Sequence, residues 1–569
     1  MPFFLGPVSA STTRLFPHLI GAGLIVALAC GLYLPFLGSP PVFDDAFLFS
    51  GERFSYYATH PFGLELRVPP YFSFAVTHVL SGRMEVHRIV SLALHLACSL
   101  ALYKLLYDLL RVVRQSDRAG PEPDARMNAA AWAFIGAAAF AIHPVAVYGA
   151  AYLVQRTIVL ATLFSLLSAV LFVRGLVRGS HPDAISAALM YSVAVLCKEH
   201  SLLLPAAVVL AVALVGVERR FAVRHAAIYL AACAPAAIFV VLLTKGLLGQ
   251  AYEPDFGRVA LQTEGAFGYD IGDFPWSLSA VTQAGLFFKY LALWLWPDTG
   301  AMSVDLRIDF LSARSPGWIL LKACAFAGWG VLGFLLLRRR GRAGLAGFGM
   351  LYTWVLFSIE LSTVRFQEPF VLYRSYLWAP GIVLAFVALL CGVPRRPALA
   401  AFAVACAALL YQAHNRLLSF SSPLALWEDA VAKLPEKPIP WGSRTLYNLG
   451  REYTYVGSTD KAMAIVDRCM AQYPNTYHCY FARGAIHLEL HEFKQALPYL
   501  TRAVSLKPEA GIAHHRLGMA LEGLGRIDEA KAYYRSASDQ GYKGADHEIS
   551  RLESPGSGLL APKKPAAAR

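Results

Sequence analysis

Charged residues are scarce in this 569-residue sequence, since Asp, Glu, Lys and Arg together make up 16% of it. Soluble domains usually carry roughly 25% charged residues. Hydrophobic residues account for 56%, and the mean hydropathy is +0.47. A soluble protein this apolar would need more interior than its length can supply, which argues against a cytosolic enzyme and against a disordered chain. The composition therefore predicts many membrane spans.

Several motifs that identify common enzymes are missing. There is no Walker A motif, which argues against ATP hydrolysis on this chain. There is also no HExxH zinc motif and no GxSxG elbow at a strand-to-helix turn. No CxxC pair occurs among the nine cysteines, and we expect them to be small buried hydrophobes rather than disulfide partners or zinc ligands. Seven of them lie inside apolar runs: Cys30, Cys98, Cys197, Cys233, Cys324, Cys391 and Cys406.

Basic residues outnumber acidic ones by 51 to 38, which gives a formal net charge of +13 and a pI of about 9.2. In a soluble protein this excess would suggest nucleic acid, but no RNA- or DNA-binding motif supports that partner. In a protein with many membrane spans, Lys and Arg collect in the cytoplasmic loops because they set the orientation. We therefore expect membrane lipids around the chain and no nucleic acid.

Apolar runs of roughly 17–25 residues suit membrane helices. Twelve candidates lie near residues 15–37, 89–110, 128–148, 150–173, 183–197, 201–217, 224–248, 279–297, 317–337, 343–362, 376–393 and 397–417. The first run is too long for the hydrophobic region of a signal peptide, and no clear small-x-small cleavage site follows it. We interpret it as an uncleaved first span.

Arginine clusters between the runs predict the orientation. They comprise Arg111, Arg114, Arg118, Arg126, Arg174, Arg178, Arg219, Arg220, Arg224, Arg338, Arg339, Arg340, Arg342, Arg395 and Arg396. All of them should be cytoplasmic, but the cluster at 338–342 falls outside if every candidate crosses. We therefore expect segment 279–297, with its Trp294 and Trp296, to be re-entrant or interfacial. About eleven crossings remain, with the N-terminus in the cytoplasm. The loops near 249–275 and 363–373 and the C-terminal domain then lie on the other side.

After about residue 418 the apolar runs give way to amphipathic, charged segments that contain a repeat. Small residues and prolines recur with a spacing of 34: Gly450, Gly484 and Gly518; Ala462, Ala496 and Ala530; Cys469, Ala503 and Ala537; Pro474 and Pro508. This pattern is typical of tetratricopeptide repeats, in which each helix pair buries its apolar face on the next. We therefore divide the all-α chain into a membrane domain over 1–418, a repeat solenoid over 419–553 and a disordered tail over 554–569.

Two adjacent carboxylates, Asp44 and Asp45, follow the first apolar run, with Phe43 and Phe47 beside them. Ionisable groups near a membrane are costly and often functional. A solvated loop pair or a helix cap would also explain them, because Asp favours caps. The spacing alone leaves these alternatives open.

Further polar groups interrupt or flank the later runs: His87, Arg88, His95, His143, Gln155, Arg156, Lys198, Glu199, His200, Arg374 and Tyr376. Each has an ordinary explanation, such as snorkelling, a cap, or an internal pair between Lys198 and Glu199. Under the predicted topology, however, most of them lie on the same outer face as the two aspartates. Carboxylates together with Arg, Lys and His suit a diphosphate-bearing substrate that needs a catalytic base.

The order of these segments resembles that of the TMTC proteins, which are membrane proteins with C-terminal tetratricopeptide repeats, and of the wider GT-C glycosyltransferases. The matching segments are Phe43-Asp44-Asp45, Arg88 to His95, Ala141-Ile142-His143-Pro144 with Tyr152-Leu153-Val154-Gln155-Arg156, Cys197-Lys198-Glu199-His200 with Pro205, and Tyr373-Arg374-Ser375-Tyr376-Leu377 with Pro380. One departure is that the family's Arg-Pro before the second span reads Val68-Pro69-Pro70, with Arg67 displaced. The resemblance covers nearly the whole chain.

The resemblance implies a GT-C fold and transfer of a sugar from a polyprenyl or dolichyl phosphate to a protein hydroxyl, on the periplasmic or lumenal side. It assigns the catalytic carboxylate to Asp44 first and Asp45 second. The implied residues for the donor and its phosphate are Arg374, Arg156, Lys198, Glu199, His143, Arg88, His95 and Tyr376. No cofactor is firmly implied and no metal ligand is assigned, although paired carboxylates are compatible with a divalent metal.

The repeat solenoid would engage the protein acceptor, for example a secreted or pilin-like protein. The residues expected on its concave face are Tyr447, Arg451, Phe481 and His515, and the alternative is that they only cover surface. A second hypothesis is a non-catalytic, membrane-anchored repeat scaffold. A third is a transporter or lipid flippase, which would favour charges near the bilayer midplane and internal symmetry between halves, and the sequence shows no such symmetry. The Ala- and Arg-rich composition favours a bacterial inner membrane, with the endoplasmic reticulum as the alternative.

Overall fold

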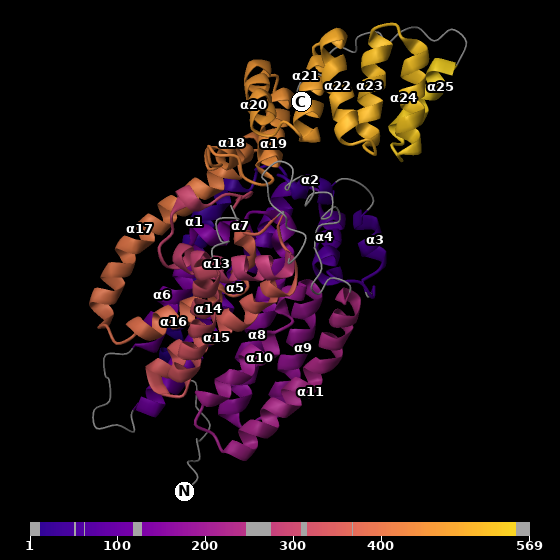
Figure 1. Ribbon diagram of the computed structural model, residues 1–569. Coiled ribbons are helices and arrows are strands. Elements are labelled where there is room, and N and C mark those ends of the chain that lie inside the picture. Colours follow the sequence, from indigo (N-terminus) through magenta and orange to yellow (C-terminus); the bar gives the residue numbers. More distant parts are fainter. Residues whose placement is uncertain are drawn as a thin grey trace. The chain divides into compact units, whose positions relative to one another are not determined.

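The computed structural model describes residues 12–49, 53–61, 63–117, 128–245, 275–308, 316–366 and 368–553 (Figure 1). Its regular structure is helical, and the described ranges contain no strand, only an isolated bridge between Leu306 and Phe370. The prediction of an all-α chain is confirmed. The loop near 249–275, the tail over 554–569 and the two arginines Arg118 and Arg126 lie outside the described residues.

The chain divides into two compact units, and the change from the first to the second falls between Leu426 and Trp427. The helices of the first unit are α1 (Thr12–Tyr33), η1 (Leu34–Phe36), α2 (Asp44–Phe49), α3 (Arg53–Thr59), α4 (Val68–Leu80), α5 (Met84–Asp117), α6 (Ala129–Ala141), η2 (Pro144–Ala146), α7 (Val147–Ala150), η3 (Leu153–Gln155), α8 (Arg156–Arg178), α9 (Pro182–Cys197), η4 (Glu199–Ser201), α10 (Leu204–Val208), η5 (Val209–Ala213), α11 (Arg219–Thr244), α13 (Pro275–Leu295), η6 (Thr299–Ala301), α14 (Pro316–Leu337), α15 (Gly341–Phe357), η8 (Ser358–Ser362), η9 (Leu372–Tyr376), α16 (Ala379–Leu390) and α17 (Arg395–Ser419).

Eight helices in the described part of the chain are long and apolar enough to cross a membrane, or nine if the bent pair α6 and η2–α7 is one span. Three more apolar helices are shorter: Pro182–Cys197, Glu199–Ala213 and Ala379–Leu390. The predicted number of about eleven is therefore not reached by full-length helices. The difference has a local cause, because the predicted runs at 183–197, 201–217 and 376–393 form these three shorter helices, which lie beside the polar segments at Lys198–His200 and Arg374–Tyr376.

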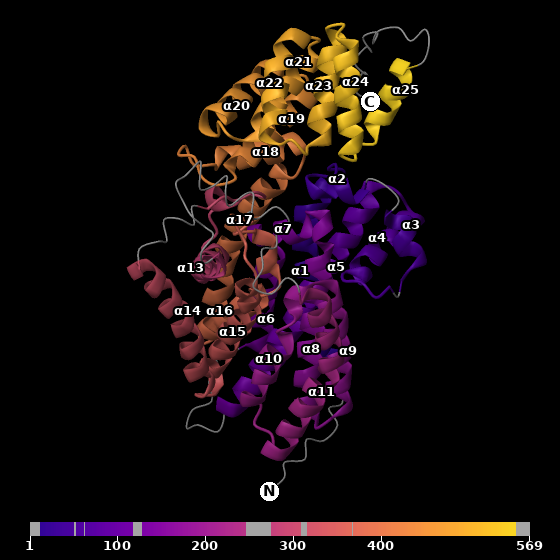
Figure 2. The same ribbon diagram turned by 45° about the vertical axis from the view of Figure 1, so that its right-hand side comes forward.

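Segment 279–297 forms one continuous helix, α13, which is long and apolar enough to be a span. In Figure 2 this helix is seen nearly along its axis, whereas α14 runs lengthwise down the picture, so the two axes cross. Trp276 and Trp296, at its two ends, are exposed. The orientation agrees with an interfacial position, which stays a prediction.

Glycine lets α15 and α16 approach closely, as is common between membrane helices. A Cβ atom at Gly349 would lie 2.5 Å from the Gly381 carbonyl oxygen, and one at Gly381 would lie 2.6 Å from the Gly349 oxygen. Any side chain at either position would push the two backbones apart. This contact fixes α16 just after η9, which carries Arg374.

Charged residues are separated along the helices of the first unit. Helix α9 ends before Lys198, which precedes η4, and α15 continues into the turn η8, Ser358–Ser362. Arginines mark the opposite ends of these same helices, because Arg178 ends α8 just before α9 and Arg340 precedes α15. The helix breaks thus gather polar groups at one end of the bundle and the arginine clusters lie at the other.

The second unit consists of helix pairs. Its helices are α18 (Pro423–Ala432), in which the unit begins, then α19 (Gly442–Tyr455), α20 (Thr459–Gln472), α21 (Tyr477–Glu489), α22 (Phe493–Leu506), α23 (Gly511–Gly523), α24 (Ile527–Asp539) and α25 (Gly544–Glu553). The repeating glycines explain the period, since a Cβ at Gly450, Gly484 or Gly518 would lie within 3 Å of the residue sixteen positions later in the paired helix. The predicted repeats are confirmed as three such pairs.

One expectation about cysteine is wrong. Cys469 and Cys479 form a disulfide that joins α20 to α21, and therefore the first helix pair to the second. The spacing of ten residues carries no motif, and only the turn between the two helices brings the Cα atoms to 5.5 Å. Within the described residues, the seven cysteines of the apolar runs are free, as expected.

The disulfide gives a stability prediction. Replacing both Cys469 and Cys479 by Ala should lower the free energy of unfolding of the second unit by roughly 2–3 kcal/mol, because the unfolded chain regains the freedom that the closed loop removes. Thermal unfolding of the full-length protein in detergent measures the loss. The free, exposed Cys324 provides the control, and an equal loss in Cys324→Ala would contradict the prediction.

Candidate functional site

A cavity of about 340 Å³, here called the polar cavity, opens where the helix breaks of the first unit meet. Its lining comes from α2, the start of α4, the α9–η4 break and the segment between η8 and α16. The lining residues are Asp44, Phe47, Leu48, Arg67, Tyr71, Val154, Gln155, Thr157, Lys198, Glu199, His200, Arg365, Glu368, Tyr373 and Arg374. Four of the predicted site residues are therefore together: Asp44, Lys198, Glu199 and Arg374.

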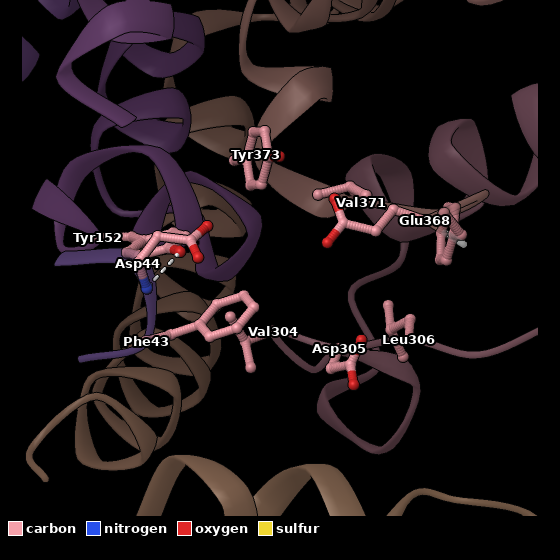
Figure 3. Close-up of a pocket in the computed structure, with 10 residues that line it drawn as sticks. Phe43, Asp44, Tyr152, Val304, Asp305, Leu306, Glu368, Val371 and Tyr373 are labelled. Carbon is pink, nitrogen blue, oxygen red and sulfur yellow. Dashed lines mark hydrogen bonds between the residues drawn. The ribbon is translucent and has the colours of Figure 1, made fainter. Parts of the chain in front are cut away.

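A smaller pocket adjoins the polar cavity and shares Asp44, Glu368 and Tyr373 with it. In Figure 3 the carboxylates of Asp44, Asp305 and Glu368 surround this pocket, with the ring of Phe43 on one side. The Asp44 amide donates a hydrogen bond to the Tyr152 hydroxyl oxygen over 3.2 Å. The pocket is thus acidic and aromatic, while the cations lie on the side of the polar cavity.

The two neighbouring aspartates have different environments. Asp44 is exposed and lines both spaces, whereas Asp45 is fully buried. The Asp45 carboxylate accepts backbone hydrogen bonds from Val154 over 2.7 Å and from Leu153 over 3.3 Å. Burial raises the pKa of Asp45 to about 7, although these N–H groups and Arg88 act to lower it. Asp45 therefore holds the loop, and only Asp44 can reach a substrate in the cavity.

Phe43 adopts a left-handed backbone conformation, with φ of 50°, directly before α2. Side chains other than glycine rarely adopt this conformation. The turn sends Asp44 and Asp45 into the first turn of α2, where acidic residues suit the positive end of the helix dipole. A local backbone constraint thus fixes the direction of the Asp44 side chain.

The cationic side of the polar cavity is a network of ion pairs, partly buried at Arg67 and Glu199 and buried at Glu360, Arg365 and Arg374. Arg67, the displaced arginine directly before α4, pairs with Glu199 at 2.7 Å and lines the cavity. Arg374 Nη1 lies 3.3 Å from Glu360, and Arg374 Nη2 lies 4.0 Å from Glu368. Buried charges of this kind are tolerated because each finds an opposite charge.

Lys198 differs from the other cations of the network. It is 8% exposed, and its side-chain amine makes no hydrogen bond or ion pair with any residue that the structure describes. Burial, with a contribution from the charge of Arg67, lowers the pKa of the Lys198 amine to about 7, although the neighbouring Glu199 raises it. A buried ammonium without a partner at a cavity wall is suited to bind an anion.

Two of the predicted donor residues, Arg88 and Arg156, do not line the cavity, because their guanidinium groups are used in the interior. Arg88 donates to the carbonyl oxygens of Ser39, Pro40 and Ala151. Arg156 donates to the His87 carbonyl oxygen over 2.8 Å and lies over the Phe74 ring. Both arginines tie segments of the first unit together instead of presenting N–H groups to the cavity.

The aromatic residues predicted to bind the donor are also in the interior. His95 bonds the Tyr376 hydroxyl over 2.6 Å and the Ala141 carbonyl oxygen over 2.8 Å. His143 lies 3.1 Å from the Trp294 carbonyl oxygen and stacks on the Trp294 ring. None of the three predicted side chains, His95, His143 and Tyr376, lines the polar cavity.

Several cavity residues were not predicted as site residues. Arg67, His200, Arg365, Glu368 and Tyr373 line the cavity. Two of them could have been predicted from the sequence. Arg67 is the displaced arginine before Val68-Pro69-Pro70, and His200 stands beside Glu199. Arg365 and Glu368 lie in a polar segment of irregular structure whose sequence has no motif. Within the described residues, no three His, Cys, Asp or Glu side chains are placed to hold a metal ion.

The second unit has its own groove, of about 460 Å³. It is lined by Tyr447, Tyr477, His478, Phe481, Lys507, Glu509, Ala510 and Ile512. Two of the predicted acceptor residues, Tyr447 and Phe481, therefore share one groove. Burial lowers the pKa of His478 to about 4, helped by Lys507 and Arg444, so this ring is neutral near pH 7.

The other two predicted acceptor residues lie elsewhere. Arg451 pairs with Glu452 at 2.8 Å, and His515 packs against the rings of Tyr534 and Tyr542 in the third helix pair. Neither lines the groove. The one-period spacing placed Tyr447 and Phe481 together, whereas His515 is one pair too far along the solenoid.

A family model described as tetratricopeptide repeat matches residues 477–509 and 512–539. These residues are tetratricopeptide repeats. The match covers the second and third helix pairs, and the first pair repeats the same glycine contact without being part of it. No curated protein matches the chain. Tetratricopeptide repeats form extended binding surfaces, so the match indicates a repeat scaffold or a protein-interaction domain at these residues.

The contrast between the two aspartates gives the next prediction. Asp45→Ala leaves the buried N–H groups of Leu153 and Val154 without their acceptor, which should cost roughly 1–3 kcal/mol of stability. The thermal midpoint in detergent should fall. The neighbouring Asp44→Ala should lower it less, since Asp44 is exposed. Equal midpoints for the two variants would contradict these roles.

The Lys198 amine should make anion binding dependent on pH. As the pH rises from 6 to 8 through its pKa of about 7, Lys198 loses its proton. Affinity for a lipid phosphodiester, whose own charge is constant in this range, should then fall about tenfold. Binding of a radiolabelled polyprenyl phosphodiester to the protein in nanodiscs measures this, and Lys198→Arg, which stays charged, should flatten the profile. A flat profile in the unmodified protein would rule out Lys198 as the ligand.

Proposed function

We propose that the chain is an integral-membrane glycosyltransferase. It transfers a sugar from a polyprenyl or dolichyl phosphate to a hydroxyl group of a protein, and its tetratricopeptide repeats engage the acceptor or a partner protein. The observation that carries the proposal is that one polar cavity contains both an exposed carboxylate, Asp44, and the buried amine of Lys198, which pairs with no side chain in the described part of the chain. The resemblance of the ordered motifs to GT-C glycosyltransferases supports the same function.

The reaction needs a base and an anion-binding group on opposite sides of the sugar. The Asp44 carboxylate accepts the proton of the acceptor hydroxyl as its oxygen attacks the anomeric carbon. The bond from that carbon to the phosphate oxygen breaks, and the phosphate leaves with the bonding electrons. Lys198 and Arg374 stabilise the negative charge of the leaving phosphate. Attack from the side opposite to the phosphate inverts the configuration of the sugar.

The proposed topology has eleven crossings. It counts the bent pair α6 and η2–α7 and the three shorter apolar helices as spans and leaves α13 at the membrane interface. The arginine clusters then face the cytoplasm, and the polar cavity opens on the other side. The disulfide supports an exported second unit, because disulfides persist in oxidising compartments such as the periplasm or the lumen of the endoplasmic reticulum. The composition favours the bacterial inner membrane.

The proposed acceptor site is the groove with Tyr447 and Phe481. Its aromatic lining and its neighbouring charges, Lys507 and Glu509, suit an extended protein segment with both apolar and polar side chains. A secreted or pilin-like protein is the expected partner. No metal ion is needed for the mechanism, which uses only side chains of this chain.

A non-catalytic scaffold is the second candidate function. It is favoured by the tetratricopeptide match, which concerns the second unit alone. It leaves unexplained why buried cations and an exposed carboxylate share a cavity in the first unit. The two functions differ in what Asp44 does, and one variant separates them.

Asp44→Asn removes the base and keeps the size of the side chain, so transfer should fall by about a hundredfold or more. Transfer of labelled sugar from a lipid-linked donor to exported proteins, followed in membranes and by intact mass, measures this. Asp528→Asn, an exposed aspartate in the second unit, is the control and should keep full activity. Unchanged transfer in Asp44→Asn refutes the base, and partner capture without transfer in the unmodified protein would favour the scaffold.

A further inference from the structure

A single buried carboxylate organises the cationic wall of the polar cavity. Glu360 lies in η8, directly after α15, and is 1% exposed. Its oxygens lie 3.0 Å from His200 Nε2, 3.1 Å from Arg365 Nε and 3.3 Å from Arg374 Nη1. Glu360 itself does not line the cavity, but all three of its partners do.

Glu360 is shared between two guanidinium groups, those of Arg365 and Arg374. A second carboxylate, Glu368, lies 4.0 Å from Arg374 and is partly exposed. Glu199 is already paired with Arg67 at 2.7 Å. Removing charges from water is costly unless opposite charges are close. The cavity wall therefore carries two guanidinium groups and the Lys198 amine, and Glu360 is a group that makes the burial of the two guanidinium groups tolerable.

The geometry matters as much as the charge. Two guanidinium groups repel each other, and long arginine side chains have many rotamers. A shared carboxylate behind them removes part of that repulsion and fixes both groups at the cavity wall. An anion that enters the cavity then meets donors that are already in place, and binding avoids the cost of ordering them.

We propose that Glu360 is the positioning residue of a phosphate-binding wall: from behind the cavity it holds Arg365 and Arg374 so that they and Lys198 bind the phosphate of the lipid-linked donor. The identity of the donor rests on the proposed function. The binding of a phosphate ester to this wall does not, because it depends only on the cations and on Glu360. The role adds Arg365 to the ligands of the phosphate and assigns a function to a glutamate that touches no substrate.

The test compares two isosteric variants of buried glutamates. Glu360→Gln keeps the shape and removes the charge, so we expect the dissociation constant for a radiolabelled polyprenyl phosphodiester in nanodiscs, and the KM for the donor, to rise about tenfold. Glu360→Asp should restore most of the affinity. Glu522→Gln is the matched control, because Glu522 is fully buried in the second unit and bonded by Tyr534 and Arg551. It should lower stability and leave donor affinity unchanged.

The outcomes separate the inference from the proposed function. If Glu360→Gln lowers the thermal midpoint as Glu522→Gln does and leaves donor affinity intact, Glu360 is only structural and the inference fails, even if transfer is observed. If the unmodified protein transfers no sugar but binds the phosphodiester in a Glu360-dependent way, the inference holds and the glycosyltransferase proposal fails. If Glu360→Gln does not fold, Arg365→Gln gives the same measurement, and an unchanged dissociation constant in it overturns the proposal.

A second arm identifies the source of the phosphate. Inorganic phosphate is added at increasing concentration to the same nanodiscs as a competitor of the labelled phosphodiester. Weak competition is expected, because a lipid-linked donor adds contacts of its sugar and its chain. Competition as strong as that of unlabelled phosphodiester would overturn the assignment of the wall to a lipid-linked donor and indicate a site for a free anion.

Discussion

The cost of burying charge is the constraint on which the polar cavity depends. Arg67, Arg365 and Arg374 lie inside a unit made of apolar helices, and none of them would be stable there without a carboxylate within ion-pair distance. Glu199 supplies that charge from the short turn η4, which follows the break at Lys198, and Glu360 supplies it from the turn η8, which continues α15. The two carboxylates thus reach the cavity wall from helix ends that are far apart in the sequence.

Much of the fold could be predicted from patterns that are local in sequence. The period of 34 residues predicts the helix pairs because each glycine contacts the residue sixteen positions later, which is a contact inside one repeat. The apolar runs predict most of the long helices for the same reason. The number of about eleven crossings stays a prediction, because the runs at 183–197, 201–217 and 376–393 form the shorter helices Pro182–Cys197, Glu199–Ala213 and Ala379–Leu390. The disulfide between Cys469 and Cys479 was missed because it depends on the turn between two helices.

The candidate site could be predicted only in part, and the residues show why. The sequence showed that Arg88, Arg156, Lys198 and Arg374 interrupt apolar regions, but not where their N–H groups point. Arg88 and Arg156 donate to backbone carbonyl oxygens and hydroxyl groups, whereas Lys198 and Arg374 line a cavity. Contacts between residues far apart in the sequence determine which of these side chains reach the cavity. The pairing of Glu360 with His200 is an example, because nothing in the sequence around either residue predicts the contact.

The pair Asp44 and Asp45 shows how a loop can present one carboxylate rigidly. Arg88 holds the loop before the pair through the carbonyl oxygens of Ser39 and Pro40, and Asp45 holds the loop after it through the amides of Leu153 and Val154. With both sides fixed, the backbone at Asp44 has little freedom, and its exposed side chain stays at the edge of two cavities. A base must lie within hydrogen-bond distance of the proton it accepts. In the proposed reaction the buried aspartate would therefore act through its neighbour, with Asp44 as the base and Asp45 as the group that holds the loop.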